Sequence, residues 1–385
     1  MHDVIVVGGG PTGSYAARRL AEKGFKVVVF EEHDDIGEPM QCTGIVGAEC
    51  VGRFPLFDGT ILREVNSASL FSPSGREIRL RREETQAYII DRTAFDRALA
   101  ASAIKCGARY ETGSRVIDIE VLGDRVRARC DGGAIHEARA AIIATGFYSR
   151  LAQRVGLGRF GGFIAGAQAR VAVDIGTEVE IYFDQDIATG FFAWLVPTHP
   201  GMALAGLFSR SRPVESLRHF ISMLAQKGRI RSEAADISPG GIPLRPLRRT
   251  YSERILVVGD AAGQVKPTTG GGVYYGLLCA EIAADTLSRC IASGDLSAEH
   301  LSAYQREWHR LIGRELRTGY IARKLYAGLS NGQIDRLFVF IQSRGISERL
   351  LQSPDVSFDW HSKAIWKSLQ YMLPGQSILS RGGKN

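Results

Sequence analysis

Three consecutive glycines, Gly8–Gly10, follow an apolar run close to the start of the chain, and this feature constrains the fold more than any other. The run DVIVV before them is short and rich in β-branched residues, as in a fully buried strand. The segment from Pro11 to Gly24 predicts a helix, because proline stands near its start and glycine at its end. The next run, FKVVVFEE, predicts a second buried strand. The chain therefore opens with a strand, a glycine-rich turn, a helix and a strand, as in an α/β fold.

The glycines of this turn have the spacing G-x-G-x-x-G. Gly8 permits a tight turn, Gly10 lets the backbone approach a pyrophosphate, and Gly13 lets the helix pack closely on the strand. The helix N-terminus then offers free N–H groups and a positive dipole end to phosphate. Glu31 closes the second strand 23 residues after Gly8, where a carboxylate can accept hydrogen bonds from an adenosine ribose. The pattern predicts a dinucleotide with a nonphosphorylated ribose, which is either FAD or NAD.

The composition limits the partners of the chain. The 385 residues are 45% hydrophobic and carry a net charge of +7, which suits a nucleotide phosphate, an anionic lipid or a nucleic acid. We expect no nucleic-acid partner, because the sequence has no zinc-finger spacing, RNA-binding aromatic signature or long basic block. The six cysteines form no C-x-x-C pair, so we expect free thiols and no metal site. No apolar run is long enough to span a bilayer, and no signal peptide precedes the first strand, so we expect a cytoplasmic protein.

A second glycine-rich stretch, RILVVGDAAGQVKPTTGGGVYYG, lies far along the chain. It predicts a buried strand that ends in Asp260, a loop with Pro267 and Gly270–Gly272, and a long helix from about Gly272. A carboxylate at the strand end can hold a ribityl hydroxyl. The helix N-terminus can face the pyrimidine edge of a flavin and stabilise its reduced, anionic form.

The remaining pattern divides the chain into three parts. Residues 92–105 predict a helix, residues 114–146 a three-stranded meander that ends in a buried strand, and residues 163–208 a series of strands. We therefore predict an α/β fold (α+β overall) with a Rossmann-like dinucleotide-binding domain, an inserted β-sheet domain and a C-terminal helical region. Their predicted ranges are 1–60, 88–160 and 250–292 for the first, 61–87 and 161–249 for the second, and 293–385 for the third.

Three elements together resemble FAD-dependent oxidoreductases of the p-hydroxybenzoate-hydroxylase-like group: the first glycine turn, the DRTAFD element from Asp91, and the GDAAG block from Gly259. Within that group, EEHDDIGEPMQCTGIV, FFAWLVP and GDAAGQVKPTTGGGVYYG resemble the geranylgeranyl reductase family. The resemblance covers roughly residues 3–290. That family saturates prenyl double bonds in archaeal membrane lipids, in the chlorophyll side chain and in some quinones. The resemblance implies an FAD-dependent reductase that adds a hydride and a proton to an isoprenoid double bond.

The resemblance also implies the residues that contact FAD. It places the pyrophosphate at the first glycine turn, the adenosine ribose at Glu31, and the ribityl–phosphate region at Arg92. Val116 corresponds to a position that meets adenine through its backbone. The implied cofactor-binding residues are Gly8, Gly10, Thr12, Gly13, Glu31, Cys42, Thr43, Arg92, Val116, Asp260, Gly272 and Val273.

Two further segments bear on the chemistry. Cys42 corresponds to a cysteine near the flavin in archaeal geranylgeranyl reductases, so its thiol could donate a proton to an alkene carbon. A small buried apolar role remains its alternative. Phe192 and Trp194 lie two apart on a predicted strand, so they face the same side and could line an apolar tunnel for isoprenoid units. A plain core role remains their alternative. Phe192 stands where the family motif usually has tyrosine.

Thr145 and Gly146 stand where flavin hydroxylases of this group usually have an Asp-Gly pair linked to nicotinamide handling. The missing carboxylate argues against hydroxylase-type NADPH use, so the electron donor stays open between NADPH, a ferredoxin and another reductant. The expected substrate is a prenylated lipid or an isoprenoid diphosphate, with peripheral contact to the inner membrane face. Two alternatives remain: a flavin-dependent monooxygenase or halogenase acting on an aromatic or polyketide-like substrate, and a non-catalytic flavin- or lipid-binding electron carrier.

Overall fold

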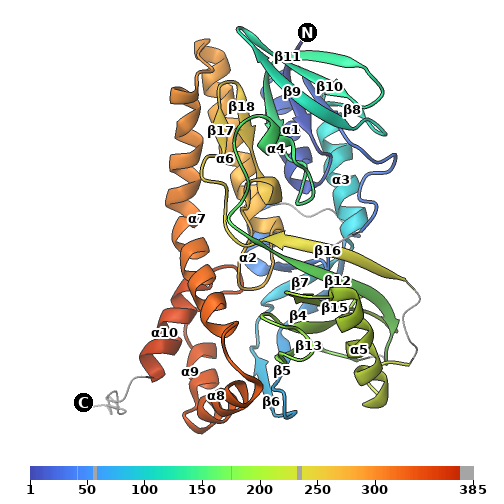
Figure 1. The fold of residues 1–385 in the computed structure, drawn as a ribbon, viewed down its shortest axis with the longest axis vertical. Helices are drawn as coiled ribbons and strands as arrows, with labels where there is room; N and C mark the ends of the chain where they lie inside the picture. Colours follow the sequence, from blue (N-terminus) through green and yellow to red (C-terminus); the bar gives the residue numbers. More distant parts are fainter. Residues whose placement is uncertain (41, 55–58, 175, 232–235, 373–385) are drawn as a thin grey trace.

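The first glycine turn belongs to an eight-stranded sheet in the upper part of Figure 1. The computed structural model describes residues 1–40, 42–54, 59–174, 176–231 and 236–372. Along the sheet the order is β17-β18-β11-β1-β2-β8, and the pairs from β18 to β8 are parallel. β9 and β10 extend β11 as an antiparallel meander. The strands are β1 (His2–Val7), β2 (Val27–Phe30), β8 (Arg109–Glu111), β9 (Val116–Leu122), β10 (Arg125–Cys130), β11 (Ile135–Ile143), β17 (Tyr251–Ser252) and β18 (Ile255–Val257).

Both faces of this sheet are covered, which explains the continuous apolar runs of its central strands. Val4 and Val6 of β1 pack against the helices on one face, whereas Ile5 and Val7 pack with the meander on the other. The first face carries α1 (Pro11–Glu22), α3 (Arg92–Lys105) and α6 (Val273–Ser293). α4 (Leu151–Arg154) lies with the meander.

A second, seven-stranded sheet forms the lower part of Figure 1. Its order is β16-β12-β15-β14-β13-β5-β6, and only the β13–β5 pair is parallel among these described strands. One face packs on α5 (Pro213–Gln226). The strands are β5 (Ser67–Phe71), β6 (Glu77–Arg81), β12 (Phe163–Ala172), β13 (Val179–Tyr182), β14 (Ala193–Pro197), β15 (Met202–Ser209) and β16 (Ile237–Pro243).

Smaller elements connect the two sheets. A three-stranded sheet has the order β3-β7-β4, and its Ile45 and Ile89 pack with Trp194 of the second sheet. These elements are β3 (Ile45–Gly47), β4 (Ile61–Val65) and β7 (Ala87–Ile90), with α2 (Ala48–Arg53) after β3.

A long helix, α7 (Ala298–Tyr326), runs beside both sheets (Figure 1). Tyr304 and Trp308 are fully buried in the core between the eight-stranded sheet and its helices. At the other end of α7, the Tyr326 hydroxyl donates a hydrogen bond at 2.7 Å to the carbonyl of Phe191, which lies just before β14 of the seven-stranded sheet. The chain continues as α8 (Asn331–Ser343), α9 (Ile346–Leu351) and α10 (Ser362–Met372). Within the described ranges, none of the helices has the length and apolar character that crossing a bilayer requires.

The sequence prediction of a mixed α/β fold is confirmed, and α3 has the predicted bounds. Two details were wrong. The strand before Asp260 ends at Val257, and Asp260 lies in the short 3-10 helix η1 (Gly259–Ala262). β14 begins at Ala193, so Phe192 precedes the strand instead of lying in it. The proposed division into cofactor and substrate domains stays a prediction, and residues 373–385 of the predicted helical region lie outside the described residues.

Candidate active site

The three glycines of the first turn have different surroundings. Gly8 has φ +107, and a Cβ there would lie 2.4 Å from the Ala144 carbonyl oxygen of the neighbouring strand. A Cβ on Gly13 would lie 2.0 Å from the Gly8 carbonyl oxygen, so only glycine lets α1 approach β1 this closely. A Cβ on Gly10 would meet no atom within 4 Å. The turn is therefore tightly packed at two glycines and open at the third.

The open position lies at the N-terminus of α1. Gly10 is the N-cap and Pro11 begins the helix, and no side chain caps this end. Thr12 in the first turn faces the second glycine-rich segment: Cβ atoms on Gly259 and Gly276 would lie 3.0 and 2.4 Å from its Oγ1. The two glycine-rich segments, far apart in sequence, therefore meet at Thr12.

Glu31 lies just beyond β2 and beside the first turn. Its carboxylate accepts hydrogen bonds from the Gly9 N–H at 2.7 Å and from the His33 N–H at 3.1 Å. Its backbone carbonyl accepts from Ser114 N–H at 2.7 Å, two residues before the buried Val116 at the start of β9. The predicted adenosine contacts Glu31 and Val116 thus lie near one another, at the end of the first sheet.

Asp260 is the carboxylate of the second glycine-rich segment. Burial raises the pKa of Asp260 to about 6, and the charge of Arg92 opposes this rise. A Cβ on Gly272 would lie 2.7 Å from Asp260 Oδ1, so the carboxylate lies against the glycine that precedes α6. Val273 begins α6, whose N-terminus also has no side-chain cap. At pH 7 this carboxyl group is partly able to donate as well as accept a hydrogen bond.

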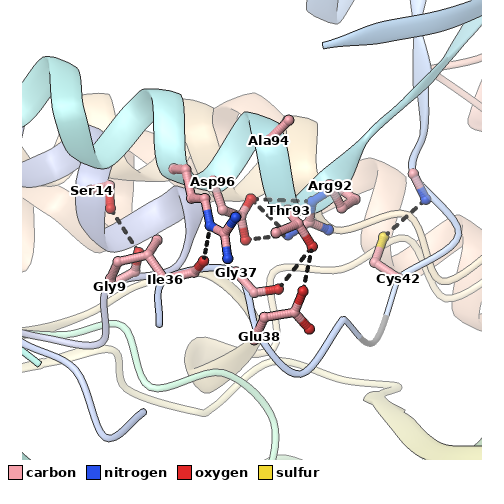
Figure 2. A network of polar contacts seen from close by, with 12 residues as sticks. Gly9, Ser14, Ile36, Gly37, Glu38, Cys42, Arg92, Thr93, Ala94 and Asp96 are labelled. Carbon is pink, nitrogen blue, oxygen red and sulfur yellow. Dashed lines mark hydrogen bonds and ion pairs between the residues drawn. The ribbon is translucent and has the colours of Figure 1, made fainter. Parts of the chain in front are cut away.

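Cys42 and Thr43 lie in the segment that leads to β3. The Gly44 N–H donates to Cys42 Sγ at 3.4 Å. Gly44 has φ +76, and a Cβ there would lie 2.4 Å from the Ile90 carbonyl oxygen and 3.4 Å from Arg92 Cγ. This close approach places the Cys42 segment beside the start of α3, as Figure 2 shows. Thr43 is half-buried.

Arg92 is the charged centre of this region (Figure 2). Its guanidinium Nη2 lies 3.1 Å from both carboxylate oxygens of Asp96, and the two side chains are only 12% and 8% exposed. Burial disfavours the charge on Arg92, but the Asp96 carboxylate and then the Cys42 sulfur raise its pKa above the ordinary value. Arg92 therefore stays positive, and its charge reaches both Cys42 and Asp260.

The predicted substrate residues lie on the face of the second sheet opposite α5. The Phe192 and Trp194 rings are 6.1 Å apart, and Trp194 lies 5.1 Å from the Phe208 ring. A Cβ on Gly270, in the second glycine-rich segment, would lie 2.8 Å from the Phe208 ring. Phe192 and Trp194 do not contact the first glycine turn, but Phe208 connects their face to the Gly270–Gly272 loop.

Gly206 makes room for the Trp194 ring. A Cβ on Gly206 would lie 2.5 Å from two ring carbons of the buried Trp194. We expect Gly206→Ala to displace the ring and lower the free energy of unfolding by about 1–3 kcal/mol, as overpacking does. Gly240→Ala on β16 is the matched control, because a Cβ there meets no atom within 4 Å. Chemical denaturation with tryptophan fluorescence measures both, and equal stability of the two variants would contradict this packing.

The residues present fit a bound FAD. The open space at Gly10 would suit a pyrophosphate beside an uncapped helix, and the uncapped N-terminus of α6 lies near Thr12 of the same turn. Thr145 adds an observation that sequence reasoning missed: its Oγ1 is buried and has no hydrogen-bond partner among the described residues. Its Cα lies 3.2 Å from a Cβ placed on Gly8, so this hydroxyl stands beside the first turn. An unpaired buried hydroxyl is costly, and a ligand would satisfy it.

A buried ion pair was also missed. Lys266 Nζ in the second glycine-rich segment lies 3.0 Å from Asp359 Oδ1, and the side chains are 5% and 2% exposed. The pair joins this loop to the segment before α10. No local pattern predicts it, because its members are 93 residues apart.

Comparison with known proteins places the chain. The profile of the family described as Lycopene cyclase protein matches residues 3–343. The digeranylgeranylglycerophospholipid reductase of Methanothrix thermoacetophila is 32% identical over 95% of this chain and 98% of its own length. A second reductase of that name, from Methanopyrus kandleri, is 33% identical over 87% of this chain and 89% of its own.

Solved structures agree with this placement. A geranylgeranyl bacteriochlorophyll reductase-like protein from Thermoplasma acidophilum has a TM-score of 0.81 at 26% identity, covering 96% of this chain and 95% of that protein. The p-nitrophenol 4-monooxygenase PnpA of Pseudomonas putida shares the fold alone, with a TM-score of 0.71 at 19% identity over 92% of this chain and 99% of that protein. The chain belongs to the geranylgeranyl reductase family, within the flavin-dependent enzymes that the Lycopene cyclase protein profile matches.

Proposed function

We propose that this protein is an FAD-dependent reductase that saturates double bonds in the isoprenoid chain of a lipid or an isoprenoid diphosphate. One observation carries the proposal: two distant glycine-rich segments meet at Thr12, and the aromatic face of the second sheet reaches the same loop at Gly270. A dinucleotide site and an apolar surface therefore adjoin. The names of the relatives support a prenylated lipid as the substrate.

Each part of the cofactor has candidate binding residues in this chain. Gly8, Gly10, Thr12 and Gly13 would hold the pyrophosphate, Glu31 and Val116 the adenosine, and Arg92 with Asp260 the ribityl chain. Cys42, Thr43, Gly272 and Val273 would lie at the flavin ring. When bound and reduced, the flavin supplies the hydride that an unactivated alkene needs.

Cys42 would supply the proton. Its Sγ–H bond breaks and a C–H bond forms at the alkene carbon next to the one that receives the hydride, so that two hydrogens add in total. The guanidinium of Arg92 lies within electrostatic reach of the Cys42 sulfur. Asp96 holds Arg92 in place through its two contacts at 3.1 Å. Reprotonation of the thiolate from solvent completes the cycle.

Phe192, Trp194 and Phe208 would exclude water from the alkene. Their rings present an apolar surface on which isoprene units can pack, and a dry surface favours proton delivery from a fixed donor over solvent. We propose NADPH, a ferredoxin or another reductant as the electron donor. With its net charge of +7, the protein would meet the lipid by peripheral contact with an anionic membrane surface.

Product mass tests the function. Protein reduced with dithionite is incubated with geranylgeranyl diphosphate and, separately, with an unsaturated ether phospholipid. We expect one or both substrates to gain mass in steps of two hydrogens. Oxygen-dependent hydroxylation or halogenation of an aromatic substrate would support the monooxygenase or halogenase alternative instead. Bound FAD and isoprenoid without any change of mass would support the electron-carrier alternative.

The proton donor is tested by Cys42→Ser. We expect this variant to retain FAD but to reduce the alkene about 100-fold more slowly, because general acid catalysis contributes at least that factor and a hydroxyl is a weaker acid than a thiol. Cys106→Ser is the control, because Cys106 follows α3 at its far end, away from Arg92. Single-turnover oxidation of the reduced protein by substrate measures the step. Equal rates for Cys42→Ser and the parent would exclude Cys42 as the donor.

A further inference from the structure

Two arginines, Arg245 and Arg323, lie at the Tyr320 ring, and a third, Arg210, lies against Gly190, next to the Phe191 with which Tyr320 shares a cluster. Arg323 lies on α7 and is 8% exposed, whereas Arg210 and Arg245 follow β15 and β16 and are exposed. Among the described residues, none of the three side chains forms an ion pair or donates a hydrogen bond, and Arg323 Nε is buried without a partner. Other buried charges in the described part of the chain are paired, as in Arg92–Asp96 and Lys266–Asp359.

Two of the three positive charges share the Tyr320 ring, and the third lies on the neighbouring Gly190–Phe191 segment. The Cζ atoms of Arg245 and Arg323 lie 4.8 and 5.7 Å from the centre of the Tyr320 ring. Arg210 lies against Gly190, where a Cβ would be 2.8 Å from its Nε. Burial, and next the charge of Arg210, lower the pKa of Arg323. The Tyr320 ring offsets part of this cost through cation–π contact, but no anion neutralises the group.

The cluster lies at one end of the aromatic face. Tyr320, Phe192 and Phe208 all pack against one buried cluster, which contains Phe191 and Val265 of the second glycine-rich segment. Gly319 comes directly before Tyr320 in α7, and a Cβ on Gly319 would lie 3.3 Å from Pro267 and Thr268 of the same segment. An apolar path therefore runs from the arginines to the loop that would hold the flavin.

We propose that Arg210, Arg245 and Arg323 form a binding site for the phosphate or diphosphate group of the prenyl substrate. This inference rests on the proposed reductase function. Guanidinium groups bind phosphoryl oxygens through paired N–H donors, and a phosphoryl group would supply the missing negative charge and an acceptor for Arg323 Nε. The exposed Arg210 and Arg245 leave the site accessible from solvent. The isoprenoid chain attached to the phosphate would then pack on the half-buried Phe192 and Phe208 and extend toward Gly270.

The test compares ligands with and without phosphate. FAD-loaded parent protein and the double variant Arg210→Gln/Arg245→Gln are titrated by calorimetry with inorganic pyrophosphate, geranylgeranyl diphosphate, an unsaturated ether phospholipid and geranylgeraniol. We expect the double variant to bind the diphosphate or the phospholipid at least about 10-fold more weakly, since charge-assisted hydrogen bonds are lost, and to bind geranylgeraniol unchanged. If the double variant binds only one of the two phosphorylated substrates more weakly, that substrate is the one whose phosphate group the arginines bind. The exposed Arg248→Gln is the matched control.

The outcomes separate this site from the reductase function. Equal affinity of the parent and the double variant for every phosphorylated ligand would overturn the proposal. Weaker binding of geranylgeraniol as well would also overturn it, because the arginines would then act on the chain and not on the phosphate. If phosphate binding depended on the arginines but the protein reduced neither substrate, the binding site would be supported and the proposed reductase function would be wrong. Arg323→Lys keeps the charge but loses the fork of donors, and we expect it to lose affinity for pyrophosphate too.

Discussion

Gly13→Ala is expected to lower the free energy of unfolding by about 3 kcal/mol or more and to yield protein without flavin, because overpacking of this kind cannot relax easily. The new Cβ would lie 2.0 Å from the Gly8 carbonyl oxygen, which is backbone and cannot rotate away. α1 would have to move away from β1, and this movement would displace the N-terminus of α1 that borders the open space at Gly10. Thermal unfolding and the visible absorption of bound flavin measure the two effects.

Gly10→Ala is the matched variant in the same turn. Gly10 has an extended backbone with φ −67, and a Cβ there meets no atom within 4 Å. We therefore expect the stability of the flavin-free protein to stay within about 0.5 kcal/mol of the parent. FAD affinity should nevertheless fall, because the methyl group would enter the space that the pyrophosphate approaches. If Gly10→Ala bound FAD as tightly as the parent, the proposed phosphate site would be wrong. If Gly13→Ala were as stable as Gly10→Ala, the close packing of α1 on β1 would be wrong.

These two glycines show what the sequence can predict. The strand, turn and helix around Gly8–Gly13 follow from local rules, because the spacing of glycines and β-branched residues encodes a backbone that few other sequences can adopt. The predicted bounds of α3 at Arg92 and Lys105 are confirmed, and the structure shows that the Asp91 side chain caps this helix by accepting a hydrogen bond from the Ala94 N–H at 3.0 Å. The fold class and the family could both be predicted in this way.

Two errors came from extending a strand pattern too far. The apolar run before Asp260 looks continuous, but Gly259 has φ +66 and turns the chain into η1. Phe192 continues the alternation of β14 but is not part of the strand. In both places a loop residue carries the same apolar or alternating character as the strand beside it, so periodicity alone cannot locate the boundary.

Three contacts or gaps in contact between distant segments could not be predicted. The partnerless Thr145 hydroxyl, the arginines around Tyr320 and the pairing of Lys266 with Asp359 all depend on the tertiary fold. The local sequence does not mark Lys266 as buried, and only the structure shows that it is. Such buried charges have large energetic consequences, and Lys266 provides the clearest test.

Asp359→Ala is expected to lower the free energy of unfolding by about 3–5 kcal/mol, because it leaves Lys266 as an unpaired buried charge. Burial already lowers the pKa of Lys266, and the Asp359 carboxylate opposes this. Without it, Lys266 Nζ would retain the Phe358 carbonyl at 3.2 Å and the Tyr275 ring at 5.5 Å. Denaturant titration measures the loss, and Asp355→Ala is the control, since Asp355 is 45% exposed in its pairs with lysines and should matter by less than about 1 kcal/mol.

The double variant Lys266→Met/Asp359→Asn decides whether the charge or the shape of Asp359 matters. A Cβ on Gly47 would lie 2.0 Å from Asp359 Oδ2, so the carboxylate fills its space closely and an amide of the same size keeps that packing. If the unpaired charge is the cause, removing both charges should restore most of the stability lost in Asp359→Asn alone, with a coupling free energy of about 2 kcal/mol. Additive losses would instead assign the effect to packing at Gly47. We expect the amount of bound flavin, measured by visible absorption, to rank the variants in the same order as their stability. The reason is that the ion pair connects the segment before α10 to the loop that carries Gly270–Gly272.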